Sequence, residues 1–352
     1  MRTSAVWHLA VLGFLAVLAA QMAPAAAAQS LEISDLFSSI ESADITLQGE
    51  GAGASVQVDL IHEGKHMATR NLAVDGPGTW AIRWPAFDAE RGSYDCCAAL
   101  RQNQTMISKR CVKFYYGGVE PIRFDVRDFR ADSRGMHLAI SARDSTVVDI
   151  YYMLLQGGKA IYVTREHAVP IAGSYATPIA KDYAWKQILQ KGLYYEGRVK
   201  IVELNHNQTR AFMNPFEAVD DALITETYQD ETGASATVLG NSRVPFVGYL
   251  RFILYQNGSL LNTTEKRTPV LLSGDDETVE ITWNSTLEPG IYQLRTVLLS
   301  QDGSVKDLEE NMIEAEPLQK SNATKTAEES SFPAGAAALA MMMAFVLIRK
   351  RR

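Results

Sequence analysis

The pattern that most clearly could carry out chemistry is His62-Glu63-Gly64-Lys65-His66, which matches the H-E-x-x-H motif of zinc hydrolases. In that motif two histidines one helical turn apart bind zinc and the glutamate polarises a water molecule, so a helix is required. Here the motif contains a glycine, follows the strand-like run 56–61, and has no histidine at its counterparts, 157–158 and 257–258. The remaining histidines of the exported part lack partner spacing: His137, His167 and His206. We expect a hairpin turn, no metal site and no cofactor, with an exported zinc hydrolase as the disfavoured alternative.

The three cysteines, Cys96, Cys97 and Cys111, suit an oxidising compartment. Segments 94–102 and 107–115 face each other across the expected turn at Asn103-Gln104, so we predict a disulfide between Cys97 and Cys111, or between Cys96 and Cys111. The remaining cysteine is either a buried inert thiol or a point of lipid or intermolecular attachment. A bond between the adjacent Cys96 and Cys97 is possible but strained, and no protease signature surrounds a cysteine and histidine pair.

Six Asn-x-Ser/Thr triplets are present, which predicts N-glycosylation at several of them. Two fall in the same turn of successive repeats, one in an expected hairpin and one in a polar stalk, where a sugar chain disturbs no core. The candidates are Asn103, Asn207, Asn257, Asn262, Asn284 and Asn322.

Tyrosine pairs at 115–116, 151–152 and 194–195 could form a platform on which sugars stack. Adjacent residues of a strand point to opposite faces, so one tyrosine of each pair is expected in a core. We take Tyr152 and Tyr195 as surface members. No glycine-rich phosphate loop, nucleophile elbow or pair of catalytic carboxylates is evident in the sequence, so the protein is expected not to be an enzyme.

The elements that carry these residues repeat along the chain. An apolar strand with a Trp is followed by Gly-x-Tyr at three places, with Trp84, Trp185 and Trp283 spaced by 101 and 98 residues. The tyrosines of this repeat are Tyr94, Tyr194 and Tyr292, and we expect these six aromatic residues in three cores. Upstream of each Trp lies a hairpin signal of apolar runs around Glu-Gly, Gly-Gly or Asn-Gly.

Units of about 95 to 100 residues with many short strands are typical of β-sandwiches. The Gly-x-Tyr element resembles the corner of immunoglobulin-like and fibronectin-III-like domains, in which a Tyr hydrogen-bonds to upstream backbone. The resemblance implies an all-β protein of three tandem immunoglobulin-like domains, expected at 31–119, 120–216 and 217–316. It implies an architecture rather than an activity.

The two ends of the sequence are predicted to direct and anchor the protein rather than to form part of its fold. Residues 1–28 carry Arg2, an apolar run and a closing Ala-Ala-Ala, the layout of a secretory signal peptide. Residues 317–331 are expected to be a flexible stalk. Residues 332–348 form a charge-free apolar run, and a helix of that length is about 25 Å long, enough to cross a thin bilayer. The basic tip, 349–352, is expected on the cytoplasmic side.

The tail resembles the C-terminal sorting signals of archaeal (PGF-CTERM-like) and some bacterial envelope proteins, although its order here is Ser-Phe-Pro-Ala-Gly. That resemblance implies recognition by a membrane enzyme and exchange of the tail for a lipid. Removing the two ends takes five of the 34 cations and none of the 41 acids, which leaves a net charge of −12. An acidic protein of this kind is not expected to bind nucleic acid.

Together these features predict a non-enzymatic, membrane-anchored cell-surface glycoprotein with a structural, adhesive or envelope-assembly role. Its expected partners are the membrane, through one C-terminal span, and envelope proteins or surface glycans. A carbohydrate-binding or polymer-binding surface module is the alternative.

Overall fold

The computed structural model describes residues 30–117, 123–174, 176–206 and 208–316. These residues form twenty-one β-strands and no α-helix, so the all-β prediction is confirmed. The part of the chain that is described contains no helix long and apolar enough to cross a membrane. The predicted signal peptide, the stalk, the apolar tail and the basic tip lie outside the described residues.

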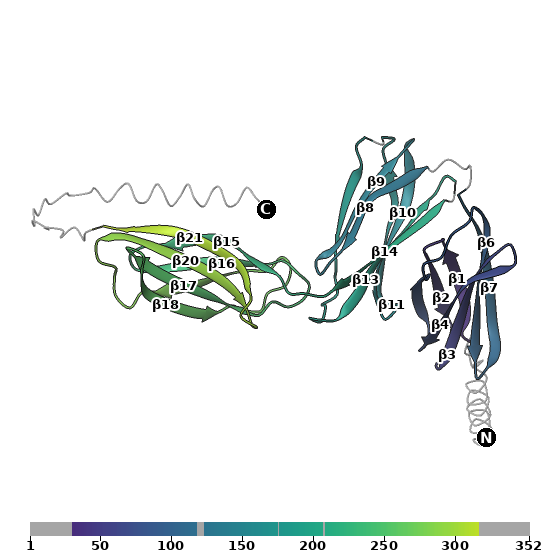
Figure 1. The fold of residues 1–352 in the computed structure, drawn as a ribbon, viewed down its shortest axis with the longest axis horizontal. Helices are drawn as coiled ribbons and strands as arrows, with labels where there is room; N and C mark the ends of the chain where they lie inside the picture. Colours follow the sequence, from purple (N-terminus) through teal and green to yellow (C-terminus); the bar gives the residue numbers. More distant parts are fainter. Residues whose placement is uncertain (1–29, 118–122, 175, 207, 317–352) are drawn as a thin grey trace, which may run out of the picture.

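The strands fall into three successive groups of seven, which follow one another from right to left in Figure 1. The first unit holds β1 (Glu32–Ser38), β2 (Ser42–Gln48), β3 (Ala54–His62), β4 (Lys65–Val74), β5 (Gly78–Arg83), β6 (Gly92–Gln102) and β7 (Thr105–Tyr116). The second holds β8 (Phe124–Ala131), β9 (Gly135–Ala142), β10 (Thr146–Gln156), β11 (Lys159–Ile171), β12 (Ile179–Ala184), β13 (Tyr194–Glu203) and β14 (Thr209–Glu217). The third holds β15 (Ala222–Gln229), β16 (Gly233–Gly240), β17 (Gly248–Gln256), β18 (Ser259–Arg267), β19 (Asp276–Thr282), β20 (Gly290–Ser300) and β21 (Val305–Ala315).

All three units share one topology. The first, second and fifth strands of a unit form a three-stranded sheet, and the fourth, third, sixth and seventh form a four-stranded sheet, with antiparallel pairing throughout. Alternate residues of each strand point inward, as the pattern of β3 from Ala54 to His62 illustrates. Each pair of sheets encloses its own apolar cluster, so the units are sandwich-like.

The predicted tryptophans occupy equivalent places in the three cores. Trp84, Trp185 and Trp283 directly follow the fifth strand of each unit and are at most 8% exposed. Each indole Nε1–H donates to a backbone carbonyl between the first two strands of its unit, at Ser39, Asp132 and Asp230 respectively. The tryptophan therefore fastens the end of one strand to a loop some fifty residues earlier.

The corner tyrosine lies where expected in two units and one residue later in the other. Tyr94 and Tyr292 are buried, and their hydroxyls donate to the carbonyls of Glu90 and Glu288, four residues upstream. In the second unit Tyr194 is 71% exposed, so its prediction as a core residue is wrong. The inward position belongs to Tyr195, whose hydroxyl accepts a hydrogen bond from the Gln190 N–H.

The physical reason for this shift is the position of the glycine. Gly92 and Gly290 are the first residues of their strands, whereas Gly192 (φ 78°) lies in a turn two residues before β13 begins. One additional residue before the inward position moves the core side chain to the next tyrosine, because faces alternate along a strand.

Candidate functional site at the junction of the first two units

The first two units are joined through the edges of their sheets. The tip of the β10–β11 hairpin meets the edge of β5: Gly158 O accepts a hydrogen bond from the Ala81 N–H at 2.8 Å, and Lys159 pairs with Trp80. The Lys159 ammonium lies 2.7 Å from Asp75 and 5.5 Å from the centre of the Trp80 ring. One seven-stranded sheet therefore runs through both units, in the order β1-β2-β5-β11-β10-β13-β14.

Charged side chains are buried where β13 of the second unit faces β2 of the first. Arg198 is fully buried, and its guanidinium donates to Asp44 at 2.8 Å and to Ser42 at 2.7 Å. Lys200 donates to the second oxygen of Asp44, also at 2.8 Å. Asp44 is 1% exposed, so its single charge is shared by two cations that come from the other unit.

This arrangement favours one relative position of the units. Removing two cations and a carboxylate from water costs several kcal/mol per ion, and only close pairing offsets that cost. Arg198 Nε remains without a partner, which makes the cluster a weak source of net stability but a strong source of specificity. Any displacement of the units would separate Asp44 from both cations at once.

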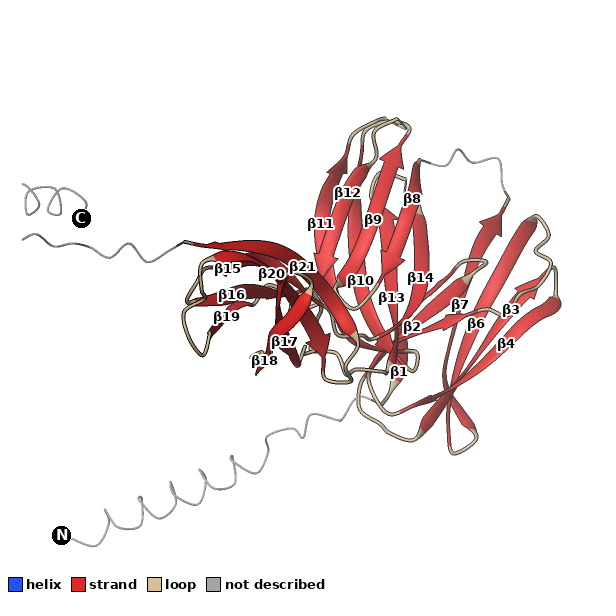
Figure 2. Ribbon diagram, turned by 60° about the vertical axis from the view of Figure 1, so that its left-hand side comes forward, coloured by secondary structure: helices blue, strands red, loops and turns tan. Residues whose placement is uncertain are grey.

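Apolar side chains surround the buried charges. Ala81, Met153 and Leu155 form a small buried cluster across the junction, with Tyr151 and Met213 packed against it. Arg83 also donates from the first unit to the Met213 carbonyl at 2.6 Å. Figure 2 shows the strands of the two units converging at this point.

The second and third units are also in direct contact. Val244, from the loop before β17, packs into the core of the second unit. Its neighbour Arg243 exchanges backbone hydrogen bonds with Ser133 and Leu189, each of 2.9 Å. Buried Asp220 accepts from Lys191 and Lys306 at 2.9 and 3.1 Å, which fixes the connection from both sides. The units are thus joined by packed contacts at both junctions.

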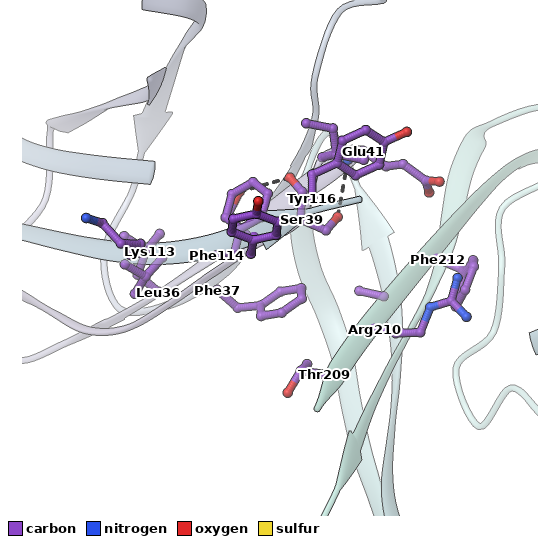
Figure 3. A pocket seen from close by; sticks show the side chains of 15 residues that line it. Leu36, Phe37, Ser39, Glu41, Lys113, Phe114, Tyr116, Thr209, Arg210 and Phe212 are labelled. Carbon is purple, nitrogen blue, oxygen red and sulfur yellow. Dashed lines mark hydrogen bonds between the residues drawn. The ribbon is translucent and has the colours of Figure 1, made fainter. Parts of the chain in front are cut away.

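An open cleft of about 460 Å³ lies beside the first junction. Its lining comes from residues 36–41 and 112–116 of the first unit and 209–212 of the second. Figure 3 shows Phe37 and Phe114 on the first-unit side, with Arg210 and Phe212 on the β14 side. Tyr115 and Tyr116, at the end of β7, add two exposed rings.

The cleft combines aromatic rings with hydrogen-bonding groups from Ser39, Glu41, Lys113, Thr209 and Arg210. Rings beside donors and acceptors are suited to bind sugars or extended polar chains. Arg210 is held by Asp125 at 2.9 Å and its guanidinium lies over the Phe212 ring, so part of this surface is fixed before any ligand binds. The part of the chain that is described holds no group of three metal-ligating residues.

The H-E-x-x-H motif forms a hairpin turn, as its glycine indicates. His62 ends β3, Glu63 and Gly64 take positive φ angles of 48° and 81°, and His66 lies on β4. His62 is buried against the Tyr94 ring at 4.4 Å and its Nδ1 contacts the Ser93 carbonyl. The two imidazoles do not share a helical face.

His137, His167 and His206 lie apart, each beside a carboxylate of its own. His137 Nδ1 is 2.7 Å from Asp182, His167 Nδ1 is 2.7 Å from Asp149, and His206 Nδ1 is 3.3 Å from Glu203.

A disulfide joins Cys97 to Cys111, which are opposite each other on β6 and β7. Cys96 points to the other face of β6 and is fully buried with a free thiol. Burial raises the pKa of the Cys96 thiol to about 11, so it is protonated and unreactive at neutral pH. The structure thus places the inert thiol in the core and the bridge on the outer face.

The predicted sugar platform on Tyr152 and Tyr195 is wrong, because both residues are buried. Tyr152 stacks on Tyr183 at 4.5 Å in the second core, and burial raises the pKa of its phenol. Among the three predicted tyrosine pairs, the exposed rings are Tyr194, Tyr115 and Tyr116, and of these only the last two line the cleft.

The glycosylation candidates are placed at the surface where the structure describes them. Asn103, Asn257 and Asn284 are exposed and Asn262 is half-buried. Asn103 and Asn257 lie in hairpin turns with φ angles of 50° and 48°. Asn207 and Asn322 lie outside the described residues.

The buried ion cluster was not foreseen from the sequence. Arg198 and Lys200 alternate with apolar residues on β13, a pattern that ordinarily indicates a solvated strand face. The only signal available was that two cations face the same side of a strand between strongly apolar neighbours.

No family model matches the chain, and no curated protein is similar to it in sequence. Among solved structures, a trypsin-activated alpha-2-macroglobulin from Escherichia coli is similar over 83% of this chain and 24% of its own, with 11% identity and a TM-score of 0.22. A tetra-tandem repeat from the extending region of a large adhesion protein is similar over 82% of this chain and 74% of its own, with 9% identity and a TM-score of 0.24. Red sea bream transglutaminase is similar over 56% of this chain and 32% of its own, with 9% identity and a TM-score of 0.25. The chain spans about a quarter of the alpha-2-macroglobulin's length, and likenesses this distant carry no argument about function.

Proposed function

We propose that this chain is a non-enzymatic cell-surface glycoprotein that serves as a structural or adhesive spacer, held to the membrane by its C-terminal tail. The proposal includes immunoglobulin-like domains, a cleaved signal peptide and an archaeal-type sorting tail. The observation that carries it is the packed connection of successive sandwich units, above all the buried Asp44–Arg198 pair between the first two. A spacer must hold its units in fixed relative positions, and this pair favours one position.

Two further features support an exported, surface-exposed protein. The Cys97–Cys111 disulfide is stable in an oxidising compartment. The described sequon asparagines at 103, 257 and 284 are accessible to a glycosylating enzyme.

Mass spectrometry of the protein from its native membrane tests this proposal. The proposal predicts a mature N-terminus after Ala28 and sugar mass on Asn103 and Asn257. It also predicts that protease added outside intact cells removes the three units. A full-length protein without sugar, recovered from the soluble cytosol and protected from that protease, would contradict it.

A carbohydrate-binding module is the second candidate, and the aromatic cleft beside the first junction favours it. If a sugar ring stacks on Tyr115, which lines the cleft and is 66% exposed, Tyr115→Ala should weaken binding of envelope glycans about tenfold. Tyr194→Ala is the matched control, because Tyr194 is 71% exposed but lies outside the cleft. Equal binding by both variants and the unmodified protein would exclude this cleft as the sugar site.

A further inference from the structure

The hairpin that contains the H-E-x-x-H motif has the same form as the hairpin that joins the first two units. In both, a two-residue turn of positive φ separates paired residues, His62 with Lys65 and Gln156 with Lys159. A register shift follows at the same place, between Leu60 and Ile61 in β3 and between Leu154 and Leu155 in β10. Lys65 is therefore the counterpart of Lys159, the lysine that contacts Trp80 and Asp75.

The β3–β4 hairpin tip is exposed. Glu63, Gly64 and Lys65 are all at the surface, and β4 is an edge strand of its sheet. Among the described residues, the Lys65 ammonium has no hydrogen bond or ion pair. A surface that makes a contact in the second unit is thus left free in the first.

The third unit presents an edge that corresponds to the one that receives Lys159. Strand β19, like β5, directly precedes the core tryptophan and is the outer strand of its three-stranded sheet. Counting back three residues from Trp84 and Trp283 places Glu280 at the position of Ala81. Lys266 donates to the Glu280 carbonyl at 2.7 Å from the side of β18, so the backbone of Glu280 points to the outer edge of β19, where Lys266 already occupies the carbonyl.

The charges of this edge suit a lysine. Asp75, which receives Lys159, lies nine residues before Trp84; the same count from Trp283 reaches Gly274, and the exposed acids Asp275, Asp276 and Glu277 follow it directly. Before β12, the other free edge of this kind, the segment 174–178 contains no acid. Residues 217–316 carry 18 acids against 6 cations, whereas the hairpin tip 62–66 carries one acid, Glu63, and one lysine, so the attraction is confined to the immediate surroundings of Lys65.

We propose that the β3–β4 hairpin tip of one copy docks on the β19 edge of a second copy of this chain. The Gly64 carbonyl accepts from the Glu280 N–H, and the Lys65 ammonium pairs with the acids 275–277. The contact is head-to-tail, so each copy has one hairpin tip and one β19 edge to offer and copies are joined in a series, which is an open row where the rotation between copies does not close a ring. This inference rests on the proposed function in one respect: it takes the copies to be anchored side by side on one cell surface.

The contact between copies is weaker than the junction within one chain. On the hairpin, Asp59 and Ile61 occupy the positions of the apolar Met153 and Leu155. The buried ion pair also has no counterpart, because Ser235 replaces Asp44 and Cys97 replaces Arg198. Binding thus depends mainly on backbone pairing and exposed charges, which salt screens. Anchoring many copies on one surface raises their effective concentration and compensates for low affinity.

Carbodiimide cross-linking of the purified full chain, prepared as a mixture of ¹⁵N-labelled and unlabelled copies, tests the proposal. The reagent joins an amine to a carboxylate in direct contact, so mixed-isotope peptides report links between copies. We expect Lys65 to be linked to Asp276 or Glu277 at low salt, with at least about a fivefold loss of the product in high salt.

Reversing the charges on either side of the contact tests directly whether these residues hold the copies together. Lys65→Glu should weaken self-association in sedimentation about tenfold, and Asp276→Lys with Glu277→Lys should do the same. Combining all three substitutions should restore it. Lys109→Glu, on the exposed face of β7, is the control and should leave association unchanged.

Three outcomes would overturn the proposal, of which the first two are cross-links between copies that do not involve Lys65 and association that Lys65→Glu leaves intact. A monomer at every concentration with no mixed-isotope peptide would also overturn it. None of these results bears on where the protein resides, so the proposed function would be judged separately by its own membrane experiment.

Discussion

At the scale of single residues, neighbouring side chains in a strand have opposite roles. Tyr194 and Tyr195 are adjacent, yet Tyr194 is exposed while the Tyr195 hydroxyl accepts the Gln190 N–H. Cys96 and Cys97 show the same contrast, with one thiol in the core and the other in a disulfide. Which residue of a pair is structural therefore depends on a register that residue type does not reveal.

Tyr195→Phe should lower the free energy of unfolding of the second unit by about 1 kcal/mol, because it leaves the Gln190 N–H without its acceptor. Chemical denaturation measures the change. Tyr194→Phe is the matched control and should have no measurable effect, so equal losses in the two variants would contradict the assignment of Tyr195 as the corner residue.

The Cys96 thiol should resist alkylation in the folded protein at pH 8, because burial both blocks access and holds its pKa near 11. After unfolding in denaturant without reductant, one thiol per chain should react with maleimide. Rapid labelling of the native protein would show that Cys96 is not in the core.

Asp230 makes the third unit sensitive to acid. Its carboxylate accepts from the Thr232 hydroxyl and from the Thr232 and Gly233 N–H groups, which lowers the pKa of Asp230 below its ordinary value of 3.8. A carboxyl whose pKa is depressed on folding stabilises the protein fully above its unfolded pKa, and the effect is lost as pH falls through the folded value. We expect the third unit to lose stability below about pH 4, and Asp230→Asn to reduce that dependence in thermal melts. An unchanged pH profile in the variant would exclude this carboxylate as the cause.

At the scale of elements, equivalent strands of the second and third units require the same small residue, glycine, at the same place. Gly135 and Gly233 begin the second strand of their units, and a Cβ at Gly233 would lie 2.3 Å from the Ile281 carbonyl oxygen. The β16 and β19 backbones approach each other closely here, beside the Trp283 contact.

Gly233→Ala should therefore force β16 away from β19 and cost about 1 to 3 kcal/mol in the unfolding of the third unit. Ser235→Ala, two residues along the same strand on a half-exposed position, should change stability much less. Similar melting temperatures for both variants would show that the strands can separate without cost.

The strands and their threefold repetition could be predicted from the sequence. Glycine turns and alternating apolar runs predict hairpins, and the repeated Trp marks the end of the fifth strand in every unit. The sequence was insufficient for Tyr194 and for the sugar platform on Tyr152 and Tyr195, because one additional residue in a turn reverses the faces of the following strand. Arg198 and Asp44 are 154 residues apart, and no local pattern connects residues at that separation.

At the scale of the whole molecule, the junctions determine how the units act together. Lys159, Arg198 and Lys200 of the second unit all bind acids of the first. In the third unit the counterpart of Arg198 is Arg295, which pairs instead with Glu310 on its own neighbouring strand. That sheet face satisfies its own charges, and the third unit connects to the second through Val244 and Asp220 instead.

Asp44→Ala should release the first junction, because it leaves the buried Arg198 and Lys200 without their carboxylate. We expect a loss of about 3 to 5 kcal/mol in the stability of the junction. Asp35→Ala removes an exposed acid that lies 3.8 Å from Lys200 and serves as the control, with an expected effect below about 1 kcal/mol.

The most direct test of a fixed junction is the distribution of distances between two spin labels, one at Thr69 on β4 and one at Lys181 on β12, measured by pulsed electron spin resonance. The unmodified chain should give one narrow distribution that broadens in Asp44→Ala and remains narrow in Asp35→Ala. A broad distribution in the unmodified chain would contradict the account, because the first two units would then move independently despite their shared sheet and buried ion pair.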